Sequence, residues 1–160
     1  MTYYKIILII IFIIFLYSLY FYHPKNIQIN QTTITNFKFS FLYEKLPIII
    51  LDTTPNIDNI INKWFKHNFI SQTNNIHTNN LWLKNNSKYK IIYTLKEQEI
   101  HISNPYTLFI NNIPSADSKI ISIKLKDNQF FILPYKWNFF VENNINTYDI
   151  NDIFTIFFNL

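Results

Sequence analysis

The 160-residue sequence contains no glycine, no cysteine and no arginine, so all 14 of its basic residues are lysine. Without cysteine the chain can form neither disulfides nor thiolate metal sites. Without glycine it can form neither a phosphate-binding loop nor a nucleophile elbow. The net charge is +4, but arginine, the preferred residue for reading bases and clamping phosphates, is missing. The composition therefore argues against a nucleic-acid partner.

Alanine and valine are also nearly absent, since Ala116 and Val141 are the only ones. Isoleucine, asparagine, lysine, tyrosine and phenylalanine dominate instead, and these residues have A/T-rich codons. Mutational bias in an A/T-rich genome is the simplest explanation. The abundance of isoleucine and asparagine is therefore not by itself taken as a structural signal.

One long apolar run stands near the N-terminus. Residues 6–22 are uninterrupted apart from Ser18, and a helix of that length extends about 26 Å, close to a hydrocarbon core of about 30 Å. The aromatic residues that would precede a cleavage site argue against a signal peptide. The run predicts a single-pass anchor in a host or virion membrane, with the lipid bilayer as a partner. Lysines on both flanks leave its orientation open.

The rest of the chain is predicted to form one domain after a short stalk. The expected division is a flank over residues 1–5, the membrane helix over 6–22, a polar stalk over 23–33 and a β domain over 34–160. Apolar and polar residues alternate with period two in many short segments, which is typical of strands. The segments predicted as strands are 37–42, 47–51, 89–95, 98–103, 119–125, 129–133, 137–141 and 153–158.

One amphipathic helix is predicted after the second of these strands. Thr54 is expected to cap it, Pro55 to occupy its first position and Asp58 to complement its N-terminal dipole. An apolar stripe follows at helical spacing from Ile57 to Phe65. Asparagine pairs at 111–112 and 143–144 and Asp127-Asn128 are expected to form the turns, because these residues tolerate left-handed backbone. The pattern indicates a mainly β sandwich or barrel with one packed helix.

Three segments resemble the cupin-like superfamily that includes the JmjC-type oxygenases. They are YEKLPIIILD at 43–52, KYKIIYTLKEQEIHISNP at 88–105 and LKDNQFFILPYKWNFFVEN at 125–143. The resemblance implies a cupin-like barrel. The arrangement of an anchor followed by an Ile/Asn/Lys-rich domain is also similar to small uncharacterised proteins of large DNA viruses.

The residues needed for that family's chemistry are not in place. Enzymes of the group hold Fe(II) with two imidazoles and a carboxylate, yet Phe139 stands where the resemblance expects the second histidine. The sequence contains no His-x-Asp or His-x-Glu pair for the remaining ligands. Period two places Phe139 with Trp137 and Val141 on one strand face. These three residues and Tyr135 are the candidate lining of a dry interior or small apolar pocket, and no cofactor is expected.

The histidines do not obviously replace the missing ligands. His101 shares its strand face with Glu99 and Ser103, opposite two isoleucines. His67 follows the amphipathic helix and His77 lies in a polar segment. These three histidines remain candidate ligands of a rearranged metal site.

Three functions are therefore open. The leading one is a membrane-anchored, non-enzymatic protein with a degenerate cupin-like domain, which has a structural or interaction role with an unknown protein partner. The second is an Fe(II)/2-oxoglutarate-type oxygenase with ligands drawn from His67, His77 and His101. The third is a small-molecule or glycan-binding module that uses an aromatic surface around Tyr106, Tyr135 and Trp137.

Overall fold

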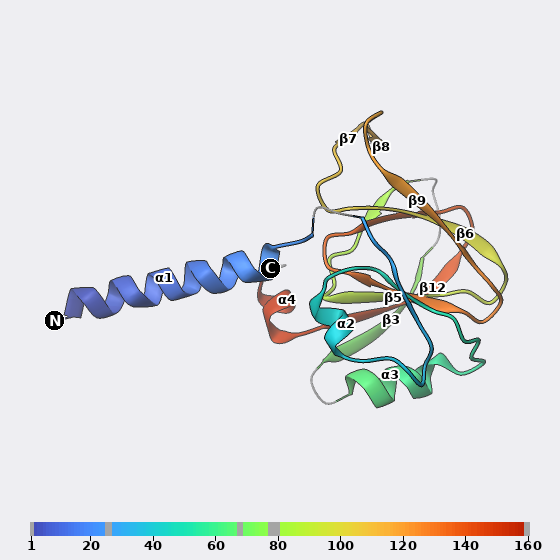
Figure 1. The fold of residues 1–160 in the computed structure, drawn as a ribbon, viewed down its shortest axis with the longest axis horizontal. Coiled ribbons are helices and arrows are strands. Elements are labelled where there is room, and N and C mark those ends of the chain that lie inside the picture. The colour runs from blue at the N-terminus through green and yellow to red at the C-terminus, as the bar shows by residue number, and fades with distance from the viewer. Residues whose placement is uncertain (1, 25–26, 67–68, 77–80, 159–160) are drawn as a thin grey trace.

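A computed structural model gives the fold of the chain (Figure 1) and describes residues 2–24, 27–66, 69–76 and 81–158. Most strands form two sheets. The six-stranded sheet has the order β1 (Asn30–Thr32), β2 (Ile48–Ile50), β10 (Phe130–Pro134), β5 (Tyr89–Tyr93), β12 (Ile145–Asn151), β3 (Ile70–Ile76). The four-stranded sheet has the order β4 (Leu83–Lys84), β11 (Asn138–Val141), β6 (Gln98–Ser103), β9 (Ile120–Leu125).

The order in which the chain visits the two sheets defines the fold. From β3 onward the chain alternates between the two sheets, except that β6 and β9 are neighbours in the smaller sheet. The strands β3, β12, β5 and β10 thus lie opposite β4, β11, β6 and β9. All pairs within these two groups of four are antiparallel. This is the arrangement of a double-sheet jelly roll, the architecture that cupins share. The prediction of a mainly β domain with two packed sheets is confirmed.

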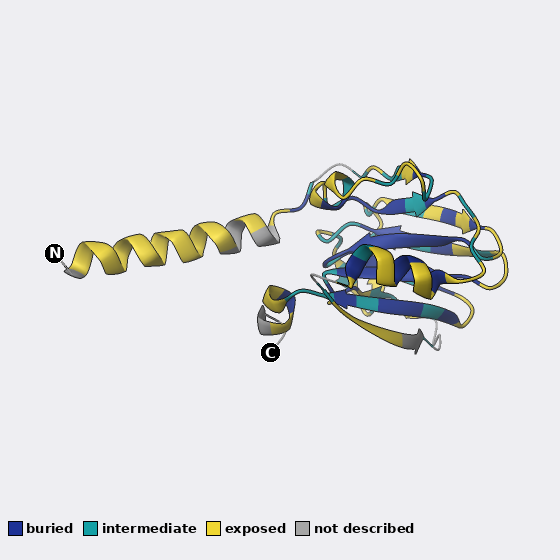
Figure 2. Ribbon diagram, turned by 90° about the horizontal axis from the view of Figure 1, so that it is seen from below, coloured by how far each residue is buried: buried dark blue, intermediate teal, exposed yellow. Residues whose placement is uncertain are grey.

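A first hydrophobic core fills the space between the sheets. Ile92 and Phe131 of the larger sheet pack there against Ile100, Phe139 and other residues of the smaller one. Strand alternation sends the neighbouring residues of β5 and β10 to the opposite face. There a second core forms against α3 (Ile57–Phe65), which contributes Ile57, Ile60, Ile61 and Phe65. Both faces of β5 and β10 are thus covered, and their residues are buried throughout (Figure 2).

The helix over the larger sheet begins later than the sequence predicts. Its N-cap is Asn56, whose side-chain oxygen accepts a hydrogen bond from the backbone N–H of Asn59 at 3.2 Å. Thr54 and Pro55 precede the cap, so the roles predicted for them are wrong. Asp58 lies in the first turn as predicted.

Two segments predicted as strands contain helices instead. Ser40–Tyr43 forms the short helix α2, and Phe37 stacks on Trp64 of α3 with ring centroids 4.0 Å apart. The alternating phenylalanines there therefore reflect packing on a helix. Residues Ile153–Phe158 form α4, because the Asp152 carboxylate caps it by accepting hydrogen bonds from the backbone N–H and the hydroxyl of Thr155.

Several turns require a left-handed backbone, and residues with side chains adopt it because the chain contains no glycine. Asn111, Asn112 and Asn128 have φ values of 50°, 62° and 57°, as the turn prediction requires. Lys45 and Lys136 also adopt positive φ, at 55° and 66°, where a side chain is costly. Asn111 and Asn112 join the small hairpin of β7 (Phe109–Ile110) and β8 (Ile113–Pro114), which projects from the body of the domain (Figure 1).

The N-terminal helix α1 (Thr2–Phe21) extends away from the β domain (Figure 1). Its side chains from Tyr3 to Leu16 are exposed. Within the described residues, no helix is long and apolar enough to cross a membrane. The predicted transmembrane segment over residues 6–22 and the single-pass membrane location are therefore wrong.

The segment predicted as a polar stalk is partly built into the domain. Its residues Asn30–Thr32 form β1, which pairs in parallel with β2, and His23 is buried. The chain thus makes contact with the jelly roll immediately after α1.

A buried asparagine ties the loop after β4 to the turn between β10 and β11. The side-chain amide of Asn85 donates to the carbonyls of Leu133 and Pro134, both at 2.9 Å. Its side-chain oxygen accepts from the backbone N–H of Ser87 at 2.9 Å. Its backbone N–H donates to Trp137, and its carbonyl accepts from Lys136. One side chain therefore satisfies buried backbone groups from two separate loops.

Replacing this side chain should be costly. We expect Asn85→Ala to lower the free energy of unfolding by about 2–4 kcal/mol, because two buried carbonyls lose their donor. Chemical denaturation measures this change. The matched control is Asn62→Ala on the exposed side of α3, which should change stability by less than about 0.5 kcal/mol. Similar small effects of both substitutions would contradict the role given to Asn85.

Candidate binding sites

The interior of the jelly roll is packed with apolar side chains around Phe139. Phe139 is only 1% exposed and belongs to the core between the sheets, together with Trp137 and Val141. Their neighbours include Ile100 and Ile102 of the adjacent strand β6. None of these side chains carries a metal-binding atom, so this part of the interior has no ligand to offer an ion.

One buried ion pair interrupts this apolar lining. Lys90 on β5 shares the face of Ile92, which points between the sheets. Its ammonium group pairs with the carboxylate of Asp149, its register partner on β12. The same carboxylate accepts a hydrogen bond from the hydroxyl of Ser87 at 2.7 Å. The charges are therefore matched inside the fold, as buried charges need to be.

Of the three candidate histidine ligands, only His101 lies in the described part of the chain. His67 and His77 fall outside the described residues. His101 lies on the outer face of β6, since its neighbours Ile100 and Ile102 point into the core. Its Nδ1 is 2.8 Å from the hydroxyl of Ser122 and 3.9 Å from a carboxylate oxygen of Glu99. Among the described residues, no group of three or more histidine, aspartate or glutamate side chains could hold a metal ion.

The aromatic surface predicted for ligand binding is not formed. Trp137 is fully buried, and its indole N–H donates to the carbonyl of Lys45 at 3.1 Å. Tyr135 is also buried, whereas Tyr106 is about half exposed. Tyr135 lines a small cavity, but Trp137, Phe139 and Val141 belong to the core.

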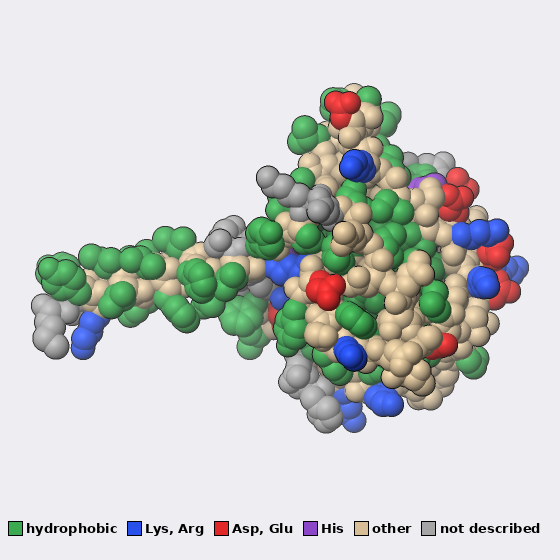
Figure 3. Space-filling model, viewed as in Figure 1, with side chains coloured by type: hydrophobic (Ala, Val, Ile, Leu, Met, Phe, Trp, Pro, Cys, Tyr) green, Lys and Arg blue, Asp and Glu red, His purple; other side chains and the backbone are tan. Residues whose placement is uncertain are grey.

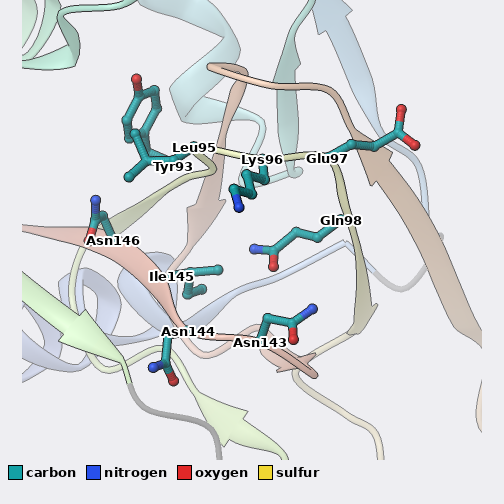
Figure 4. Close-up of a pocket in the computed structure, with 9 residues that line it drawn as sticks. All are labelled: Tyr93, Leu95, Lys96, Glu97, Gln98, Asn143, Asn144, Ile145 and Asn146. Carbon is teal, nitrogen blue, oxygen red and sulfur yellow. The ribbon is translucent and has the colours of Figure 1, made fainter.

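A large pocket lies between the loop that joins β5 to β6 and the loop that joins β11 to β12. It has a volume of about 510 Å³ and is open to solvent on one side. Its lining consists of Tyr93, Leu95, Lys96, Glu97, Gln98, Asn143, Asn144, Ile145 and Asn146. Figure 4 shows Lys96 and Gln98 pointing toward Ile145, with Asn143 and Asn144 at the opposite rim. Side-chain amides thus face an open space; we call this pocket the amide cleft.

The smaller pocket lies where α1 meets the domain. It has a volume of about 90 Å³, and we call it the junction cavity. Its lining consists of His23, Leu42, Tyr43, Lys45, Lys88, Tyr89, Pro134 and Tyr135. The Tyr106 hydroxyl donates to the carbonyl of His23 at 3.2 Å and holds the backbone at the cavity. The structure therefore draws residues from widely separated segments to this junction.

Lys45 connects the junction cavity to α1. Its ammonium group donates to the carbonyls of Leu19 and Tyr22, at 2.6 and 2.8 Å, which is how a cation stabilises the C-terminus of a helix. Burial, assisted by the nearby Lys88, lowers the pKa of Lys45 to about 8. The Lys45 ammonium group is therefore partly removed from water.

His23 is the most perturbed titratable group of the cavity. It is 3% exposed, and neither ring nitrogen has a hydrogen-bond partner among the described residues. Burial, together with the charges of four lysines, lowers its pKa from 6.5 to about 4. Those residues are Lys45, Lys84, Lys88 and Lys136. The imidazole is therefore neutral at physiological pH.

Neither pocket was identified from the sequence. His23 appeared there only within the polar stalk, and Lys45 only within the cupin-like segment 43–52. The one available signal was the concentration of lysines and tyrosines at positions 43–45, 88–90 and 135–136. The amide cleft gave no signal, because asparagine is common throughout the chain.

The fold and these sites define a mainly β protein of the double-sheet jelly-roll class. No known protein family matches the sequence, and no curated protein matches it. A solved structure of hydroquinone 1,2-dioxygenase from Sphingomonas sp. TTNP3 with 4-hydroxybenzoate bound is similar over 54% of this chain and 61% of that enzyme. The identity is 14% and the TM-score is 0.33, which carries no argument about activity. The resemblance to virus proteins stays a prediction.

The neutral, buried imidazole predicts a dependence of stability on pH. The unfolded chain binds a proton at His23 near pH 6.5, whereas the folded chain does so only near pH 4. Between these values the unfolded state holds more protons, so the free energy of unfolding should fall as the pH falls, by up to about 3 kcal/mol. Urea unfolding at several pH values measures this. His23→Phe should show a shallower decline, and an identical decline would contradict the burial of a neutral imidazole.

Proposed function

We propose that this chain is a non-enzymatic protein with a degenerate cupin-like domain, which binds a partner or contributes to a structure. The observation that supports it is the position of Phe139. Where the resemblance to the JmjC-type oxygenases expects a metal-binding histidine, a phenyl ring is packed between the two sheets among other apolar side chains. Such a position favours a stable core and offers no ligand to iron.

The placement of His101 weighs against an oxygenase with rearranged ligands. Its side chain is on the outer face of β6, whereas Phe139 is on the inner face of the neighbouring strand β11. Two side chains on opposite faces of one sheet are turned away from each other and are poorly placed to share an ion. The remaining polar pair in the interior, Lys90 and Asp149, is already matched in charge.

Iron retention and turnover test this proposal. We expect the full-length protein, purified after growth with added iron, to hold far less than one iron ion per chain and to release no succinate from 2-oxoglutarate. Metal analysis and a coupled succinate assay measure these outcomes. Stoichiometric iron with 2-oxoglutarate turnover would refute the proposal. If that iron were lost in His101→Ala, the rearranged oxygenase would replace it.

A second candidate function is the binding of a neutral, polyhydroxylated small molecule such as a sugar. The amide cleft supports it, because its volume of about 510 Å³ lies within the usual range of ligand pockets, about 300–1,000 Å³. Asparagine and glutamine side chains offer both donors and acceptors, as hydroxyl groups require. The proposal places the ligand at Gln98, Asn143 and Asn146, away from the aromatic residues that the sequence suggested.

Thermal unfolding in the presence of neutral mono- and oligosaccharides tests this function. We expect at least one sugar to raise the Tm of the full-length protein, and Gln98→Ala to abolish most of that rise because an amide is removed from the cleft. Gln72→Ala on the exposed edge strand β3 is the matched control and should keep it. A screen without any rise, or equal rises in both variants, would count against sugar binding in the cleft.

A further inference from the structure

The junction cavity contains a polar group that the fold leaves unsatisfied. His23 lines the cavity and is almost fully buried, yet neither of its ring nitrogens meets a donor or acceptor in the described part of the chain. Leaving a buried polar atom without a partner costs about 1–3 kcal/mol. A buried polar atom without a partner calls for an explanation. A ligand bound in the adjacent cavity would provide the missing hydrogen-bond partner.

The surrounding charges indicate the sign of that group. Lys45 and Lys88 line the cavity, and Lys84 and Lys136 are close enough to act on the imidazole. Lys88 pairs with Asp152, whose oxygen is 3.2 Å from the Lys88 ammonium group. Part of the Lys45 charge is offset by the carbonyls at the end of α1. The charges of all four lysines act on the imidazole in the same direction, and Figure 3 shows lysine atoms at the base of α1.

The size of the cavity limits what can enter. A volume of about 90 Å³ is well below the roughly 300–1,000 Å³ that is usual for ligand pockets. A nucleotide or a sugar is too large, whereas a small oxyanion has the right dimensions. Such an anion would accept hydrogen bonds from an imidazole N–H and from lysine ammonium groups.

We propose that the junction cavity is a binding site for a small oxyanion, such as a phosphate group, held by His23, Lys45 and Lys88. The anion would be bound beside the end of α1 and the turn that carries Tyr135. It would offset the mutual repulsion of the lysines and give the imidazole a partner. Occupancy would therefore strengthen the attachment of the N-terminal segment to the jelly roll.

Inorganic phosphate is the probe for this site. The full-length protein, kept in solution with a nonionic detergent because the side chains of α1 are exposed, is unfolded thermally at pH 6 in increasing phosphate. Chloride at the same ionic strength is the reference. We expect phosphate to raise the Tm by roughly 3 °C at about ten times its dissociation constant. An equal effect of chloride, or no rise, would overturn the proposal.

Matched variants locate the site. His23→Phe keeps an aromatic ring in the cavity but removes both nitrogens, and Lys88→Met removes one charge; both should lose most of the phosphate-dependent rise. Lys126→Met, in an exposed position between β9 and β10, should keep it. A full rise in His23→Phe would place the anion elsewhere and overturn the assignment.

A spectroscopic measurement keeps the test decisive even if His23→Phe does not fold. In the wild-type protein, the imidazole that titrates at the lowest pH is followed by NMR with and without phosphate. Bound phosphate should raise the pKa of this imidazole, because an anion favours its protonated form. An unchanged titration at saturating phosphate would overturn the proposal.

Discussion

The side-chain amide of Asn85 holds together the part of the structure that forms the junction cavity. It fixes the carbonyls of Leu133 and Pro134 at the start of the turn between β10 and β11. That turn orients Trp137, whose indole N–H reaches the carbonyl of Lys45. The Lys45 ammonium group in turn caps α1. A series of hydrogen bonds, buried at Asn85 and exposed at the end of α1, thus connects the jelly roll to the N-terminal helix.

Strands with strong apolar patterns could be predicted because their apolar side chains form the two hydrophobic cores. β5, β6, β9, β10 and β11 lie where isoleucine and phenylalanine runs indicate them. β3 and β12 have sequences rich in asparagine and threonine and were missed. β12 forms a central strand nonetheless, because its pairing with β3 and β5 satisfies its backbone on both sides. Strand pairing of this kind decides structure where composition gives no pattern.

The errors in the helical segments have local causes. Asp152 caps α4 through Thr155, a contact that outweighs the β-branched and aromatic character of residues 153–158. The candidate sites were beyond sequence reasoning for a different reason. The junction cavity is lined by residues from before β1, after α2, before β5 and after β10. The spacing of these residues in the sequence does not show that they lie together in the fold. Phe139 was the exception, since strand alternation alone was enough to place it with Trp137 and Val141.

The absence of glycine affects the entropy of folding as well as the backbone geometry of the turns. Each left-handed turn residue, such as Lys136 or Asn128, raises the energy of the native backbone. Glycine, however, also loses the most conformational freedom when a chain orders. A chain that carries none begins from a narrower denatured ensemble, so closing its tight connections gives up less entropy. This smaller loss of entropy partly offsets the backbone strain of these turns.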